Sequence, residues 1–217
     1  MTRDEFSKYH WEYYLVLEKD FLQTERFISF DLGKNYLYDK KGCTNYGNSM
    51  CFSNEFIKQY QSICSEIDVI LKTICKEINN KSKAKEIKGY TNEVLKKWPG
   101  ITNQKVAMKD IELIPFMNWS LQPYNSPDWW PPYNNVKHKR IKDYKEANLK
   151  NVLNSLAALY ILEHYLVKYI GDRDSTYDVP NDISQLFEMV NYKTRKTVVG
   201  RNSYLTSDEE LYEIFND

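Results

Sequence analysis

The residue types best suited to chemistry gather in one short segment of this chain. Asn134, Lys137, His138 and Arg140 lie within seven residues. On a helix, Asn134 and His138 would share a face because they are four residues apart, and the two cations would flank that face. The cations can hold a phosphate, and an imidazole can move a proton at neutral pH. The set predicts cleavage of a phosphodiester, and with a ribose 2′-hydroxyl as the nucleophile it needs no metal ion.

Basic residues continue beyond this motif. From residue 137 to residue 150, six positive side chains and two negative ones, six minus two, give a local charge of +4. Further candidate contacts to RNA or a phosphate are Lys139, Lys142 and Lys145. A basic stretch of this kind favours polyanion binding. The alternative is a helix surface whose lysines only confer solubility and whose histidine lies at a solvated helix end.

The segment just before the motif is rich in aromatic residues and proline. Residues 119–133 hold three of the five tryptophans and four of the seven prolines. Proline fixes φ, and aromatic side chains supply large contact areas at low entropy cost. We therefore expect a rigid, packed loop that leads into a helix. The aromatic residues expected to support the motif are Trp129, Trp130 and Tyr133.

Composition limits the classes of function. Lys and Arg number 30, as do Asp and Glu, so the formal net charge is zero and a surface that binds polyanions everywhere is excluded. Among the 217 residues, 42% are hydrophobic and 15% aromatic, which excludes a disordered chain. This length favours one domain. It would comprise an N-terminal helix over 4–22, a core bundle over about 50–170 and a C-terminal appendage over 171–217.

Hydrophobic spacing predicts a mainly α fold, an antiparallel helical bundle with a small β-hairpin or short strands in the long loops. Ser53 suits the N-cap of the clearest helix. A long connection over 24–52 separates this helix from the first. The helices are expected over 4–22, 53–79, 84–98 and 143–170, with short helical pieces at 184–190 and 207–215 and short strands at 105–108 and 111–114.

Other groups that could do chemistry are few. Glu66 lies one turn from Ile63 and Ile70, so it is a possible buried acid and would then need a partner. His164 lies in an apolar helix, where a satisfied core histidine is the ordinary role, and His10 has no evident partner. With three histidines and none of the common nucleotide, metal or hydrolase motifs, we expect no metal ion and no cofactor.

The chain shows no sign of a membrane or secretory destination. Its charged N-terminus lacks an apolar stretch of secretory type, and its longest dense apolar run, 156–162, is far too short to span a bilayer. These features predict a cytoplasmic protein without membrane partners. The four cysteines are then expected to be free thiols.

The motif and the helix after it resemble the HEPN superfamily, named for higher eukaryotes and prokaryotes nucleotide-binding. The resemblance rests on Trp129-Trp130, Tyr133-Asn134, Val136-Lys137-His138 and Arg140, on the apolar helix 148–170, and on residues 53–76. It implies an all-α bacterial protein of the toxin or phage-defence type, in which His138 is the general acid or base of a metal-independent endoribonuclease. It also implies a homodimer and an antitoxin or another defence protein as a partner.

The sequence departs from the superfamily at one position. The usual signature has an Arg four to six residues before the His, and here Asn134 and Lys137 occupy comparable places. Lys supplies the charge of Arg without its planar fork. A second hypothesis therefore stays open, in which the chain is a non-catalytic interaction or scaffold module, such as a regulatory or sensor component of a defence system.

Overall fold

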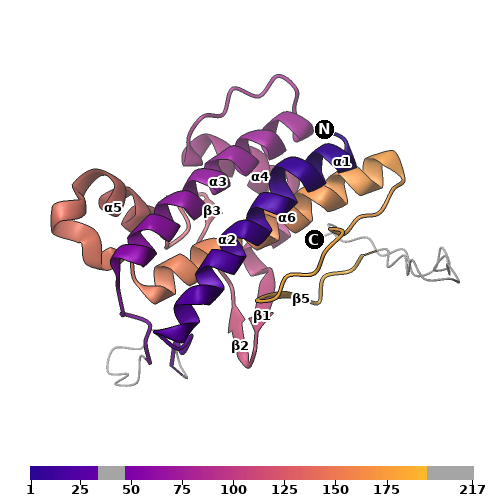
Figure 1. The fold of residues 1–217 in the computed structure, drawn as a ribbon. Helices are drawn as coiled ribbons and strands as arrows, with labels where there is room; N and C mark the ends of the chain where they lie inside the picture. The colour runs from indigo at the N-terminus through magenta and orange to yellow at the C-terminus, as the bar shows by residue number, and fades with distance from the viewer. Residues whose placement is uncertain (34–46, 195–217) are drawn as a thin grey trace, which may run out of the picture.

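The computed structural model describes residues 1–33 and 47–194. They form a mainly α fold with a few short antiparallel strands, as the sequence predicts. Three long helical segments lie side by side: α3 and α6 pack directly on each other, and the N-terminal segment packs against both, while α5 lies at one end of the molecule (Figure 1). The predicted helical piece at 207–215 and Cys43 fall outside the described residues.

The N-terminal helix runs without interruption but changes type. It consists of α1 (Arg3–Phe6), a π-helical turn η1 (Ser7–Trp11) and α2 (Glu12–Gln23), and a 3-10 turn η2 (Thr24–Arg26) follows. The helix predicted over 4–22 is confirmed. The π turn could not be predicted, and it changes which side chains face inward: Trp11 and Tyr14 are buried, while Tyr9 and Tyr13 are exposed.

The second long segment begins where the sequence predicts. Helix α3 (Asn54–Ile78) is capped by Ser53, whose Oγ accepts a hydrogen bond from the Phe56 N–H at 3.0 Å. Helix α4 (Ile87–Lys97) follows and leads into a 3-10 turn, η3 (Pro99–Asn103). Of the predicted connection over 24–52, residues 34–46 lie outside the described part. A single β-bridge joins Phe52 to Asn148.

A small sheet covers one side of the helices. Strands β1 (Lys105–Met108) and β2 (Ile111–Leu113) form the predicted antiparallel hairpin, and β5 (Glu188–Val190) pairs with the other edge of β1. The helical piece predicted at 184–190 is therefore wrong. Glu18 accepts hydrogen bonds from the backbone N–H groups of Gln185 and Leu186 at 2.9 and 3.2 Å. In a helix these N–H groups would bond to backbone carbonyls, and here the carboxylate on α2 takes their place.

The aromatic segment and the helices after it are more divided than the sequence predicts. A two-stranded turn, β3 (Ser120–Leu121) with β4 (Tyr124–Asn125), precedes α5 (Trp130–Asp143) and a 3-10 turn, η4 (Tyr144–Glu146). The helix predicted over 143–170 is α6 (Leu149–Asp174), which begins at the Asn148 N-cap. The boundary expected at residue 171 thus falls inside α6.

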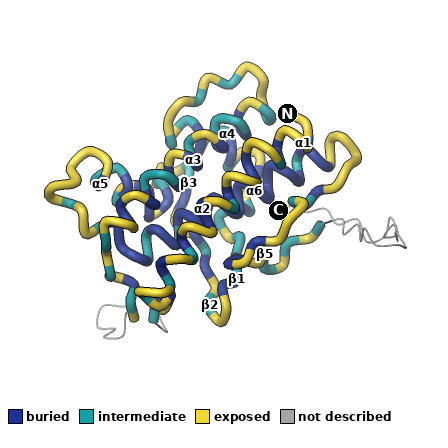
Figure 2. Tube along the Cα trace, in the orientation of Figure 1, coloured by how far each residue is buried: buried dark blue, intermediate teal, exposed yellow. Residues whose placement is uncertain are grey.

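Helix α6 is the centre of the hydrophobic core. It is buried on almost every side from Val152 to Lys168 (Figure 2). The core is contiguous and contains side chains from the helices, from the β1–β2 hairpin and from the 186–187 segment. Cys64 and Cys75 are buried free thiols of α3, and Cys51 is a partly buried free thiol. In the described ranges, no helix combines the length and apolar character needed to cross a membrane.

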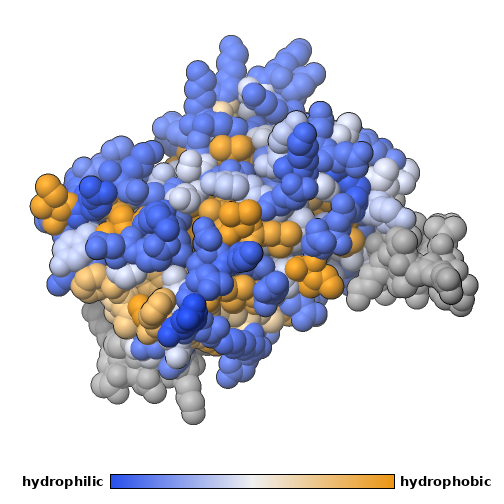
Figure 3. Space-filling view, in the orientation of Figure 1, coloured by the Kyte–Doolittle hydropathy of each residue, from blue (hydrophilic) through white to orange (hydrophobic). Residues whose placement is uncertain are grey.

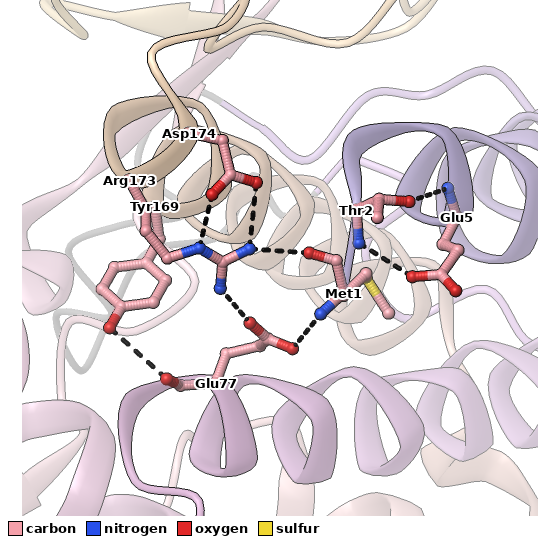
Figure 4. Close-up of polar contacts among 7 residues, drawn as sticks. All are labelled: Met1, Thr2, Glu5, Glu77, Tyr169, Arg173 and Asp174. Carbon is pink, nitrogen blue, oxygen red and sulfur yellow. Dashed lines mark hydrogen bonds and ion pairs between the residues drawn. The ribbon is translucent and has the colours of Figure 1, made fainter.

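An ionic contact holds the start of α1 against the ends of α3 and α6. The Met1 amino group lies 2.6 Å from Glu77 Oε1, and the Arg173 guanidinium donates to Glu77 Oε2 at 2.6 Å and to the Met1 carbonyl at 2.7 Å (Figure 4). Asp174 accepts two further hydrogen bonds from the same guanidinium. The contact fixes how the N-terminal helix lies against its two neighbours.

Candidate functional site

The predicted motif lies on α5, and its basic side chains face solvent. Trp130, Tyr133 and Val136 are buried on the inner face of the helix. We define the basic α5 surface as the exposed side chains Lys137, His138, Lys139, Arg140, Lys142 and Lys145. The end of the molecule that carries α5 is mostly hydrophilic in Figure 3. The fold thus presents the predicted catalytic and phosphate-binding cations together, on the outside.

Buried aromatic residues fasten α5 to the bundle. Trp129 is 2% exposed, its indole N–H donates to the Pro115 carbonyl at 2.9 Å, and its own carbonyl accepts from the Tyr60 hydroxyl of α3. The Trp129 and Trp130 rings meet edge to face at 5.7 Å, and the Trp130 and Tyr133 ring centroids lie 5.3 Å apart. The packed aromatic support predicted for the motif is present.

No hydrogen bond or ion pair joins the motif side chains into a preassembled catalytic set within the described residues. In the part of the chain that the structure describes, the side chains of Asn134, His138 and Arg140 make no hydrogen bond or ion pair. Lys137 Nζ lies over the Tyr133 ring, 5.6 Å from its centroid. A kink at Lys139, with φ −132° and ψ 33°, interrupts the helical spacing between Lys137 and Arg140.

Two side-chain contacts are made near the end of α5, at the downstream part of the basic α5 surface. Lys145 Nζ lies over the Phe52 ring, 5.7 Å from its centroid. The Glu146 carboxylate accepts a hydrogen bond from Asn135 Nδ2 at 3.0 Å, so this acid is held next to the helix. The five cations of the basic α5 surface form no ion pair within the described ranges. Their charge is thus available to an anionic ligand.

A second group of chemically active side chains lies inside the bundle. Glu66 is buried, as predicted, and its Oε1 lies 3.4 Å from His10 Nδ1. The partner of His10 that was not evident from the sequence is thus Glu66, although their contact is too long or poorly aligned to be a hydrogen bond. Glu163 of α6 joins this pair, and one donor atom from each of the three residues lies within 4.8 Å of the others. We call His10, Glu66 and Glu163 the buried cluster.

The sequence around Glu163 also indicates a buried acid, although Glu163 was not among the predicted site residues. Its neighbours three and four residues away on α6, Tyr160, Leu159, Leu166 and Val167, are all apolar or aromatic and all buried. An acid surrounded in this way on a helix cannot reach solvent without breaking the apolar face. His10 gave no comparable signal, because the π turn determines which residues of its helix face inward.

His164 has the role of a satisfied core histidine. It is 8% exposed, and its Nδ1 lies 2.9 Å from the Tyr160 carbonyl, which can only accept, so Nδ1 carries the proton. Burial lowers the pKa of His164 from 6.5 to about 4, with the hydrogen bond to Tyr160 opposing that shift. The imidazole is neutral at physiological pH.

We expect His164 to make the folded state less stable in mild acid. Because its pKa is lower in the folded than in the unfolded chain, the unfolded chain binds more protons below pH 6.5, and stability falls as the pH falls toward 4. From pH 7.5 to pH 5 this residue should cost about 2 kcal/mol of unfolding free energy. Urea unfolding of wild type and His164→Gln at both pH values measures the difference. Equal pH dependence in the two proteins would contradict this account.

Comparison with known proteins does not identify a family for this chain. No protein-family model matches the chain, and no match was found among curated proteins or solved structures. The HEPN resemblance therefore stays a prediction from sequence.

Proposed function

We propose that this protein binds RNA through the basic α5 surface. The observation that carries the proposal is the placement of five cations and His138, all exposed, on α5 and the η4 turn that follows it, where buried aromatic residues fasten α5 to the core. A neutral chain with one such concentration of positive charge favours a local anionic ligand. RNA is preferred because its 2′-hydroxyl provides the nucleophile for a reaction without a metal ion.

Cleavage would use the residues that the motif supplies. His138 would act as the general base or acid, Lys137 and Arg140 would hold the phosphate, and Asn134 would orient the reacting groups. The exposed imidazole has the access to substrate that a proton-transfer residue needs. Since these side chains form no hydrogen bonds with one another in the free protein, bound RNA would have to align them, as is common for catalytic hydrogen bonds in unbound enzymes.

The HEPN resemblance extends this proposal to partners and setting. We infer a cytoplasmic protein of the toxin or phage-defence type, with a homodimer that brings two α5 motifs together and with an antitoxin or another defence protein as a possible partner. Ile141, which is 99% exposed between the cations of α5, supports a protein contact at this place.

A non-catalytic role is the second candidate, and one observation favours it. Trp129, Trp130 and Tyr133 belong to the hydrophobic core, which accounts for the aromatic segment without any catalytic function. The chain would then be an interaction or scaffold module whose α5 surface binds RNA or a partner without chemistry.

One comparison separates the two candidates. Wild type, His138→Ala and a control, Lys83→Ala in the exposed loop between α3 and α4, are incubated with RNA in the presence of EDTA. If the protein is a nuclease, His138→Ala should lose cleavage by roughly a hundredfold while RNA affinity changes little. Equal cleavage by wild type and His138→Ala, with the fold intact, would exclude the enzymatic role. RNA binding without cleavage in all three proteins would support the second candidate.

A further inference from the structure

Three helical segments each contribute one side chain to the buried cluster. His10 comes from η1, Glu66 from α3 and Glu163 from α6, and these residues are 3%, 8% and 0% exposed. They meet where the N-terminal helix packs against both α3 and α6 (Figure 1). Two carboxylates and an imidazole therefore share a small volume inside the bundle.

Several polar atoms of the cluster are buried without a hydrogen bond. Within the described ranges, neither carboxylate oxygen of Glu163 has a hydrogen-bond partner, and the same holds for Glu66 Oε1 and His10 Nδ1. Buried carboxylates are ordinarily paired, hydrogen-bonded or bound to a metal ion. Burial, and to a lesser extent the charge of Glu66, raises the pKa of Glu163 well above its usual value. The cluster therefore needs either protons or a cation.

The buried lysine of the same helix is engaged elsewhere. Lys168 Nζ lies 2.9 Å from Asp172 Oδ1 and 3.0 Å from Asp178 Oδ2. In the described part of the chain, no Lys or Arg side chain forms an ion pair with Glu66 or Glu163. The two acids thus have no Lys or Arg counter-ion among the described residues, and His10 is the basic group placed beside them.

The backbone at His10 departs from the regular α-helix. His10 lies in the π-helical turn Ser7–Trp11, and both His10 and its neighbour Trp11 are buried. A π turn inserts a residue into a helix, and such turns are frequent at functional sites. The ionic contact at Met1 and the hydrogen bonds of Glu18 hold this helix before and after the turn.

The donor atoms are close to the spacing that a metal ion requires. Ligands about 2.1 Å from a tetrahedral ion lie about 3.4 Å from one another. His10 Nδ1 and Glu66 Oε1 already have this separation of 3.4 Å, and all three donor atoms fall within 4.8 Å. Two carboxylates and a neutral imidazole carry a charge of −2, which a divalent cation cancels.

We propose that His10, Glu66 and Glu163 bind one divalent transition-metal ion, of the Zn²⁺ or Mn²⁺ class, between the N-terminal helix, α3 and α6. The imidazole selects this class over Mg²⁺ and Ca²⁺, which prefer oxygen ligands alone. Three protein ligands leave at least one coordination position for water or another small ligand. This site revises the expectation of a chain without a metal, and it does not depend on RNA binding by α5.

Metal titration of the full chain tests this proposal. After removal of metal with EDTA, the protein is titrated with Zn²⁺, Mn²⁺ and Co²⁺, with affinity and stoichiometry measured by calorimetry and unfolding by thermal scanning. We expect one ion per chain and a higher unfolding temperature with the ion than after EDTA treatment, because an ion that binds only the folded state stabilises it. Bound Co²⁺ should also develop the visible absorption of a coordinated ion.

Variants connect binding to the three residues. Glu163→Gln and Glu66→Gln should each weaken the affinity at least about tenfold. Asp68→Asn is the matched control, since it alters a carboxylate of α3 that pairs with Lys72 and Tyr90 outside the cluster, and it should keep the ion even if it lowers stability. Wild-type protein that binds none of the three ions would overturn the proposal, as would cluster variants that bind with wild-type affinity. Either result would indicate that the two carboxylates share protons instead.

Discussion

Replacing Trp129 with alanine is expected to lower the free energy of unfolding by about 3 to 5 kcal/mol. The indole is 2% exposed and packs against Phe116 and Trp130, so its removal leaves a large cavity. Its N–H also donates to the Pro115 carbonyl, which would be left without that partner in the interior. The effect should reach α5, because Trp129 directly precedes this helix.

Chemical unfolding of wild type and Trp129→Ala measures the difference in stability. Trp129→Phe is the control, since it keeps an aromatic ring and removes the hydrogen bond, and it should cost clearly less than alanine. Proteolysis under native conditions should cut within 130–146 faster in Trp129→Ala than in wild type if α5 is released locally. A destabilisation below about 1 kcal/mol, in the range of surface substitutions, would show that the aromatic segment does not fasten α5.

The positions and approximate lengths of the main helices could be predicted from local sequence. The N-cap Ser53 and the regular apolar spacing after it determine α3 through bonds and burial within one segment, so its prediction needed no knowledge of the rest of the chain. The β1–β2 hairpin is local in the same way. Segment 184–190 differs because its backbone conformation depends on Glu18 and on the edge of β1, both distant in sequence.

The two candidate sites differ in the same respect. The basic α5 surface is contiguous in sequence, so its residues and exposure could be anticipated, although the kink at Lys139 could not. The buried cluster joins residues 10, 66 and 163, which only the packing of three helices brings together. Glu66 was recognised as an inward acid from its position on α3, while its partner could not be identified, because a π turn sets the direction of His10.

The second large effect expected is a decrease in RNA affinity when the charge of α5 is removed. The triple variant Lys139→Gln, Arg140→Gln and Lys142→Gln removes three exposed cations that make no ion pair with described residues. For single-stranded RNA, each cation that no longer neutralises a phosphate should reduce the dependence of log K on log salt by about 0.7. Removing all three should therefore reduce the slope by about 2 and weaken binding roughly tenfold or more at low salt.

A matched control comes from another basic part of the surface. Lys81, Lys83 and Lys85 are exposed in the loop between α3 and α4, and replacing all three with Gln removes the same charge. Non-specific attraction would be weakened equally in the two triple variants, whereas a defined site would be weakened only in the α5 variant. Neither set includes a residue of the buried cluster or of the hydrophobic core.

The most direct measurement is the affinity of wild type and both triple variants for one fluorescent single-stranded RNA, by anisotropy over a series of salt concentrations. We predict that wild type and the Lys81/Lys83/Lys85 variant bind with similar affinity and salt slope, and that both quantities are reduced in the α5 variant. No binding by wild type, or equal decreases in the two variants, would contradict the proposal that the basic α5 surface is the RNA site.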